Sequence, residues 1–173
     1  LRSLPGMGQK SEEKILKGIL NLEQASGRFT LGAARPIAEE ILGRIRAIQG
    51  VKEAQYAGSL RRGRETVGDV DLLVSTKNGA AVMNEFLATP NIREVLAQGD
   101  TKSSVVLTNG LQVDLRVVPG KSFGAALQYF TGSKGHNIQL RELAVRKKLK
   151  VNEYGVFEAE TDKPVAGKKE EDV

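Results

Sequence analysis

The chain contains no cysteine, a single histidine and no long apolar run. Without cysteine, disulfide bonds and thiolate metal sites are excluded. A membrane-spanning helix needs about 20 consecutive apolar residues, and neither such a run nor a signal-like start occurs. The 173 residues are 40% hydrophobic, which is enough for a buried core. We therefore expect a globular protein in the cytoplasm, with no membrane partner.

Positive charge is unevenly distributed along the chain. In total, 26 Lys and Arg stand against 21 Asp and Glu, a formal charge of +5. Residues 155–173 carry three basic and six acidic residues, which leaves 23 basic and 15 acidic residues in 1–154. A basic body can attract nucleic acid or polyphosphate through counterion release, although surface charge also serves solubility. Charge alone leaves the function open.

Hydrophobic periodicity predicts an α+β fold with a mixed sheet and helices on one face. The start reads as a tight turn over 4–8 and a helix with Ser11 as N-cap and Ile15, Leu16, Ile19 and Leu20 inward. Further helices are predicted over 34–48, with Pro36 in the first turn, and over 80–87, 123–128 and 138–150. Strands are predicted over 51–56, 69–75, 103–108, 111–118 and 151–157. We expect 158–173 to be a loop or a truncated element.

Three aspartates on predicted strands are the candidate metal ligands. Asp69 and Asp71 are two residues apart, so in a strand both project to the same face. Asp114 lies on the polar face of the alternating strand at 111–117. Neighbouring carboxylates repel one another unless a divalent cation lies between them, and oxygen ligands favour magnesium. If the two strands are neighbours, the three aspartates can surround two Mg²⁺ ions, with Mn²⁺ as the alternative.

A basic turn precedes the first two aspartates. Gly58 and Ser59 end a predicted strand and open a helix, whose free N–H groups and dipole favour an anion such as a triphosphate. Arg61 and Arg62 follow directly. An isolated Asp-x-Asp is usually the solvated face of an edge strand, and an Arg-Arg pair is usually solvated too. However, the occurrence of Gly-Ser, Arg-Arg, Gly-Asp-x-Asp and a further strand aspartate in this order along the chain predicts a nucleotidyltransferase.

The segment from Tyr129 to Ser133, Tyr-Phe-Thr-Gly-Ser, discriminates among nucleotidyltransferases better than the motifs described so far. Together with Gly-Ser-x-Arg-Arg-Gly and Gly-Asp-x-Asp, it makes residues 1–157 resemble the family X DNA polymerases, which include DNA polymerase beta, and most of all their bacterial branch. The resemblance implies a partial fingers region over 1–33 with a helix-hairpin-helix-like turn, a catalytic palm over 34–120 and a partial thumb over 121–173. It also implies that further domains lie before and after this stretch in the parent protein.

Site residues follow from the same resemblance. Asp69 and Asp71 would bind both metal ions, and Asp114 the catalytic one. The expected nucleotide contacts are Gly58, Ser59, Arg62, Gly68, Arg28, Tyr129, Phe130, Gly132 and Asn137, with an unusual peptide geometry at Gly132-Ser133. The expected DNA contacts are Gly6, Gly8, Lys102, Arg116, Lys134, Arg141 and Tyr154. The lone His136 receives no role. At Gln112 the chain departs from DNA polymerase beta, which has arginine there, and this leaves the tuning of Asp114 open.

The resemblance implies a reaction and its partners. The protein would add deoxynucleotides from dNTP to the primer end of a primer-template or gapped DNA during repair, as a monomer. Two alternatives stay open from the residues alone. One is a nucleotidyltransferase acting on RNA or a small molecule, and the other is a DNA-binding module without turnover.

Overall fold

The computed structural model describes residues 8–10, 12–13, 15–16 and 27–173. The predicted turn over 4–8 with Gly6, the Ser11 cap and the inward Ile19 and Leu20 lie outside these residues, apart from Gly8. The carbonyl of Gly8 accepts a hydrogen bond from the Glu12 N–H at 3.1 Å, a helical contact. Within the described ranges, no helix has the length and apolar character that crossing a bilayer requires.

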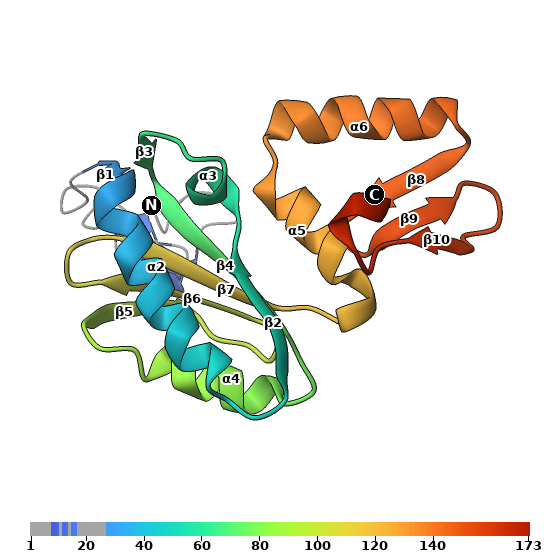
Figure 1. Ribbon diagram of the computed structural model, residues 1–173. Helices are drawn as coiled ribbons and strands as arrows, with labels where there is room; N and C mark the ends of the chain where they lie inside the picture. Colours follow the sequence, from blue (N-terminus) through green and yellow to red (C-terminus); the bar gives the residue numbers. More distant parts are fainter. Residues whose placement is uncertain (1–7, 11, 14, 17–26) are drawn as a thin grey trace.

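A five-stranded mixed sheet forms the larger part of the molecule (Figure 1). In spatial order its strands are β2 (Val51–Tyr56), β4 (Asp69–Thr76), β7 (Gln112–Val117), β6 (Lys102–Leu107) and β5 (Ile92–Ala97). β4 and β7 are parallel, and the other neighbours are antiparallel. The four predicted strands over 51–118 are confirmed. The edge strand β5 was missed because its side chains are largely exposed and lack a regular apolar alternation.

Two helices, α2 (Leu31–Arg46) and α4 (Gly79–Leu87), cover one face of this sheet (Figure 1). They pack on side chains of β4 that alternate toward them, including the fully buried Val70, Leu72 and Val74. The predicted mixed sheet with helices on one face is confirmed. The helix predicted over 34–48 begins earlier than predicted, at Leu31, so Pro36 lies inside it and not in its first turn. The Leu31 N–H at this start donates to the Glu65 carbonyl at 2.9 Å.

Short elements connect β2 to β4. The chain leaves β2 through α3 (Gly58–Arg61), a single helical turn. It then forms β3 (Thr66–Val67), which pairs with β1 (Phe29–Thr30) in a two-stranded antiparallel sheet. This connection places the basic turn directly before the strand that carries Asp69 and Asp71.

Residues 123–173, here called the C-terminal segment, form a separate layer beside the sheet (Figure 1). A 3-10 turn, η1 (Gly120–Ser122), leads into it. Its elements are α5 (Phe123–Thr131), α6 (Lys134–Arg146), β8 (Leu149–Asn152), β9 (Gly155–Glu158), β10 (Pro164–Ala166) and η2 (Glu170–Asp172). A small second core joins α5 to the face of β4 that points away from α2, through Leu73, Phe123 and Leu127. The C-terminal segment therefore meets the same face of β4 that carries Asp69 and Asp71.

Two predictions for this segment are wrong in detail. The predicted helix over 138–150 begins at Lys134, because the Ser133 hydroxyl accepts a hydrogen bond from the His136 N–H at 3.4 Å and caps it. The predicted single strand over 151–157 is a hairpin of β8 and β9. At its turn, the Asn152 side chain accepts hydrogen bonds from the N–H groups of Tyr154 and Gly155 at 2.8 and 3.2 Å.

The predicted loop over 158–173 is also wrong. β10 pairs with β9, and η2 packs against α5. The carbonyls of Gly167 and Lys168 accept hydrogen bonds from the N–H groups of Ala125 and Gly124, at 2.9 and 3.1 Å. Since the first N–H groups of a helix lack partners within it, these carbonyls satisfy the start of α5. Tertiary contacts, not local patterning, thus order the end of the chain.

Candidate active site

The register of β4 against β7 brings the predicted carboxylates to neighbouring strands. Asp71 stands directly opposite Asp114, and Asp69 stands opposite Gln112. Because alternate residues of a strand share a face, all three aspartates lie on the side of the sheet opposite to α2 and α4. The predicted adjacency of the two strands is confirmed.

The pKa of Asp71 is raised in this crowded, buried position. Burial and the charges of Asp69 and Asp114 together raise its pKa from 3.8 to about 6, with burial the largest cause. Arg116 and Lys102 act in the opposite direction. Neighbouring like charges that raise a carboxyl pKa are the situation that a bound divalent cation relieves.

Both oxygens of Asp114 already have partners. Gln112 donates from Nε2 to Oδ1 at 2.8 Å, and the Lys102 ammonium lies 3.1 Å from Oδ2. Accordingly, the described part of the chain holds no ready-made group of three His, Cys, Asp or Glu side chains arranged to bind a metal ion. The donor chemistry still fits, because three carboxylates on one face offer only the hard oxygen ligands that Mg²⁺ prefers. The metal-binding role of the three aspartates stays a prediction.

Gly58 lies against the Asp71 carboxylate. Its φ is +62°, and a Cβ at this position would come within 2.4 Å of Asp71 Oδ2. Only glycine meets both conditions, since other residues rarely adopt such a φ and would displace the carboxylate. The following helix, α3, has only four residues. A helix dipole was predicted to favour an anion here, but a helix this short contributes little to anion binding. Ser59 and Arg62 are the side chains through which this turn offers polar groups to the cleft.

A cleft of about 500 Å³ gathers most of the predicted site. It lies between the acidic end of β4, the α3 turn and the two helices α5 and α6. Its lining residues are Gly58, Ser59, Arg62, Asp69, Asp71, Tyr129, Phe130, Gly132, Ser133, Lys134, Asn137 and Arg141. Carboxylates, a basic turn and an aromatic pair, far apart in the sequence, thus border one space.

The wall opposite the carboxylates is built around the end of α5. The Gly132-Ser133 peptide bond is cis, which confirms the expected unusual geometry. Arg62 donates through Nη1 to the Thr131 carbonyl. Arg61 donates to the Thr131 hydroxyl at 2.8 Å and also forms a two-pronged ion pair with Glu170, at 2.6 and 2.7 Å. The basic turn is thereby tied to the end of α5 and to η2.

The side chains expected to contact nucleotide and DNA already contact one another. Tyr129 and Phe130 pack edge to face, with ring centroids 5.2 Å apart, and the Arg116 guanidinium lies 4.5 Å from the centroid of Phe130. Asn137 donates to the Tyr129 carbonyl at 2.7 Å and accepts from Gln128 at 3.0 Å. Their roles toward nucleotide and DNA stay predictions.

A second concavity, of about 910 Å³, shares Ser59, Arg62 and Ser133 with the cleft. Arg28 also borders it, fixed by hydrogen bonds to the Thr66 hydroxyl and carbonyl at 2.8 and 2.6 Å, and lies next to Gly68. Arg64, which the sequence analysis missed, lines it as well. A third arginine directly after the Arg-Arg-Gly turn was the signal available. The concavity offers three arginines to an anion.

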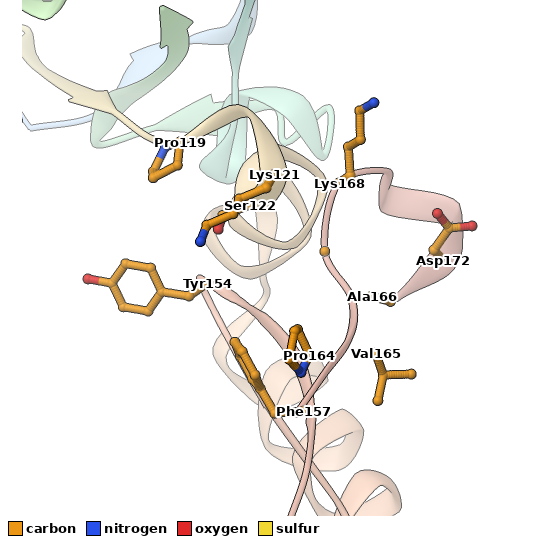
Figure 2. Close-up of a pocket in the computed structure, with 11 residues that line it drawn as sticks. Pro119, Lys121, Ser122, Tyr154, Phe157, Pro164, Val165, Ala166, Lys168 and Asp172 are labelled. Carbon is orange, nitrogen blue, oxygen red and sulfur yellow. The ribbon is translucent and has the colours of Figure 1, made fainter. Parts of the chain in front are cut away.

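Tyr154 lies elsewhere. It is 60% exposed and borders a cavity of about 670 Å³ with Phe157, Pro164 and Lys121 (Figure 2). This cavity shares no lining residue with the cleft. Lys102 faces Asp114, and Gly8 is exposed near the N-terminus. The predicted DNA contacts are therefore distributed over several surfaces, of which the cleft holds Lys134 and Arg141.

Two family models match the chain. The one described as DNA polymerase beta palm matches residues 33–141, and the one described as DNA polymerase beta thumb matches residues 126–173. The palm match contains all three aspartates and the basic turn. The thumb match contains most of α5 and all of α6 and the three-stranded sheet.

Several curated proteins are similar in sequence. DNA polymerase/3'-5' exonuclease PolX of Bacillus subtilis is 42% identical over 163 residues, which cover 93% of this chain and 29% of that protein. DNA polymerase lambda of Rattus norvegicus is 32% identical over 59% of this chain and 21% of its own length. Repair DNA polymerase X of African swine fever virus is 30% identical over 62% of this chain and 66% of its own length. The chain thus spans less than a third of the first two relatives.

Proposed function

We propose a DNA polymerase activity on the premise that this chain belongs to family X, the DNA polymerases that include DNA polymerase beta. The reaction is the addition of a deoxynucleotide to the 3′-hydroxyl of a primer on template or gapped DNA, as in repair. The observation that carries the proposal is the parallel register that sets Asp71 opposite Asp114 beside a cleft bordered by basic and aromatic side chains. The proposed palm is 34–120, and the proposed thumb is 121–173.

The carboxylates supply the metal side of the site. Asp69 and Asp71 would hold two Mg²⁺ ions, and Asp114 would complete the shell of the ion nearest the primer. When bound, the ions activate the attacking hydroxyl and offset negative charge on the triphosphate and the leaving pyrophosphate. Asp114 also offers a carboxylate that can accept the proton of the primer hydroxyl. Gln112, at the position where DNA polymerase beta has an arginine, donates a hydrogen bond to Asp114 that fixes the orientation of this carboxylate.

The other side of the cleft binds and orients the nucleotide. Ser59 and Arg62 would hold the triphosphate, and for this Arg62 exchanges the Thr131 carbonyl for phosphate oxygens. Arg28 and Arg64 extend the same positive surface. The Tyr129–Phe130 pair would pack against the sugar. On the neighbouring helix, three further side chains would contact the base or the template strand: Lys134, Asn137 and Arg141.

Primer extension on gapped DNA with Mg²⁺ and dNTP tests this proposal. Asp114→Asn should lower incorporation by about a hundredfold or more, because a group that stabilises the transition state is lost. DNA binding, measured by fluorescence anisotropy, should stay near the wild-type value. Asp100→Asn, an exposed aspartate in the loop before β6, is the matched control. Extension by Asp114→Asn at the wild-type rate would refute the role of the carboxylate.

Two further arms separate the alternatives. A parallel assay with an RNA primer tests a nucleotidyltransferase that acts on RNA. DNA binding by the wild-type chain without Mg²⁺-dependent incorporation would instead identify a DNA-binding module without turnover. Preferential extension of a DNA primer is the outcome expected here.

A further inference from the structure

We propose that Lys102 is an internal counter-ion of the three aspartates. Its ammonium pairs with Asp114 and leaves this carboxylate when a divalent cation binds. Nothing in the family resemblance gives Lys102 this role, since the residue is expected there only as a DNA contact. The inference rests on the proposed metal-binding role of the aspartates and deepens it. It makes Lys102 a competitor of the metal ion.

The position of Lys102 in the sheet carries the first step. It is the first residue of β6, and its Cα partner across the strands is Arg116 of β7, two residues beyond Asp114. From there its ammonium reaches diagonally to Asp114 Oδ2 at 3.1 Å, while Gln112 donates to the other oxygen. Asp114 is only 13% exposed, so water has little access to replace these partners.

The other cations near the carboxylates have different partners. Arg116 packs over the ring of Phe130, and Arg62 donates to the Thr131 carbonyl. Among the ion pairs between described residues, the one made by Lys102 is the pair that includes an aspartate of this group. Among the described residues, Lys102 is thus the cationic group that forms an ion pair with one of the three aspartates, whereas Arg116 acts on Asp71 through its charge without such a pair.

Physical properties of the lysine side chain make exchange feasible. Its ammonium is a compact charge on a flexible four-carbon chain, and 41% of the side chain is exposed. Lys102 can therefore move into water at little cost, whereas the carboxylates are fixed on paired strands. A divalent ion carries twice the charge and can bind several carboxylates at once. Both cations would be held by the Asp114 carboxylate, so binding of one would oppose binding of the other.

Two simpler explanations predict different behaviour. If the pair only stabilises the sheet, removing the ammonium lowers stability without improving metal affinity. If Lys102 is only a DNA contact, its removal weakens DNA binding and leaves metal affinity in the absence of DNA unchanged. A counter-ion instead predicts that metal affinity rises when the lysine is removed.

The test is a Mn²⁺ titration of the 173-residue chain without DNA or nucleotide, with free Mn²⁺ followed by its EPR signal. Lys102→Met should bind Mn²⁺ about three to ten times more tightly than wild type, because one adjacent positive charge is gone. Lys102→Arg keeps the charge and should return the affinity toward wild type. Lys77→Met changes net charge equally at the far end of β4 and should bind Mn²⁺ as wild type does.

Asp114→Asn in the same titration separates this inference from the proposed function. If Asp114→Asn weakens Mn²⁺ binding while a folded Lys102→Met leaves it unchanged or weaker, the counter-ion role is overturned and the metal site stands. If wild type binds no Mn²⁺ at millimolar concentration, or Asp114→Asn binds equally well, the metal site and the inference both fall. Circular dichroism monitors folding, and Lys102→Gln replaces the methionine variant if that one does not fold.

Discussion

The five-stranded sheet and the C-terminal segment are held in place by different means. The sheet is closed by a core whose largest members are fully buried between the sheet and the helices α2 and α4, such as Leu72 of β4, Leu42 of α2 and Phe86 of α4. In the C-terminal segment, α6 buries a single residue, Ala144, and leaves Leu143 and Val145 48% and 71% exposed. A small apolar contact, backbone hydrogen bonds and an ion pair attach this segment to the rest.

This difference matches what each region contributes to the site. The aspartates lie on β4 and β7, where neighbouring strands on both sides fix their spacing. The groups expected to contact nucleotide and template lie at the end of α5, beyond its buried residues 123–127, and on α6, of which Ala144 alone is buried. Regions with few buried contacts open at low free energy, and substrate-binding elements are commonly drawn from them. The two regions should therefore respond separately to substitutions.

The largest expected effect concerns the crowded carboxylates. Asp71 has a pKa raised from 3.8 to about 6, so its ionised form is disfavoured in the folded protein. A raised pKa contributes stability below about pH 4, and this contribution is lost as pH rises through 6. Asp71→Asn should therefore be more stable than metal-free wild type at pH 7, by about 3 kcal/mol, and equally stable near pH 4.

Urea unfolding with EDTA at both pH values measures this effect. Asp100→Asn, in an exposed loop, should leave the free energy of unfolding unchanged and controls for the loss of one negative charge. An Asp71→Asn variant that is less stable than wild type at pH 7 would show that burial and the charges of Asp69 and Asp114 together do not disfavour the ionised Asp71. The sheet would then gain stability from its acidic edge instead of losing it.

The same contrast explains what the sequence could predict. In β4 and β7, alternation separates Asp69, Asp71 and Asp114 from buried aliphatic residues, so local patterning sufficed for both strands and for their shared polar face. The neighbouring register of the two strands needed the structure. In the C-terminal segment, the Asn152 turn and the Ser133 cap were local signals that the apolar pattern obscured.

Other features had no local signal. β10 and η2 exist because the Gly167 and Lys168 carbonyls meet the start of α5 and because Glu170 meets Arg61, 109 residues away in sequence. Neither contact follows from the composition of 158–173. The same holds for the Lys102 contact with Asp114, since two separate strands must first be placed side by side.

A smaller effect is expected where residues 167–170 cross the start of α5. A Cβ on Gly124 would lie 2.1 Å from the carbonyl carbon of Lys169, whereas one on Gly43 of α2 would meet no atom within 4 Å. Alanine in a helix is otherwise more stable than glycine by about 1 kcal/mol. Gly43→Ala should therefore stabilise the protein by up to this amount, while Gly124→Ala should cost about 1–3 kcal/mol through overpacking.

Urea unfolding gives both values, and hydrogen exchange locates the change. Gly124→Ala should lower the protection of Ala125 and of β9, and leave the amides of β4 and β7 unaffected. Equal loss of protection in the sheet would show that the two regions unfold together. A stabilising Gly124→Ala would show that the backbone of 167–170 moves freely away from α5.

The smallest effect is expected at the ion pair between the regions. Arg61 and Glu170 are about one third exposed, and the hydrogen bond that Arg61 donates to Glu170 is the largest of the causes that raise the pKa of Arg61. Glu170→Gln keeps the shape but removes the charge, so the cost in stability should be about 1 kcal/mol or less.

The effect of Glu170→Gln on function should be clearer, because Arg61 also holds the Thr131 hydroxyl beside the cleft. With that tie loosened, the apparent KM for dNTP in primer extension should rise severalfold while kcat changes less, and Glu171→Gln, an exposed neighbour, should match wild type in both. A fall in kcat at unchanged KM would mean that the ion pair acts on the carboxylate edge of the sheet, and that the two regions are not as separate as their packing indicates.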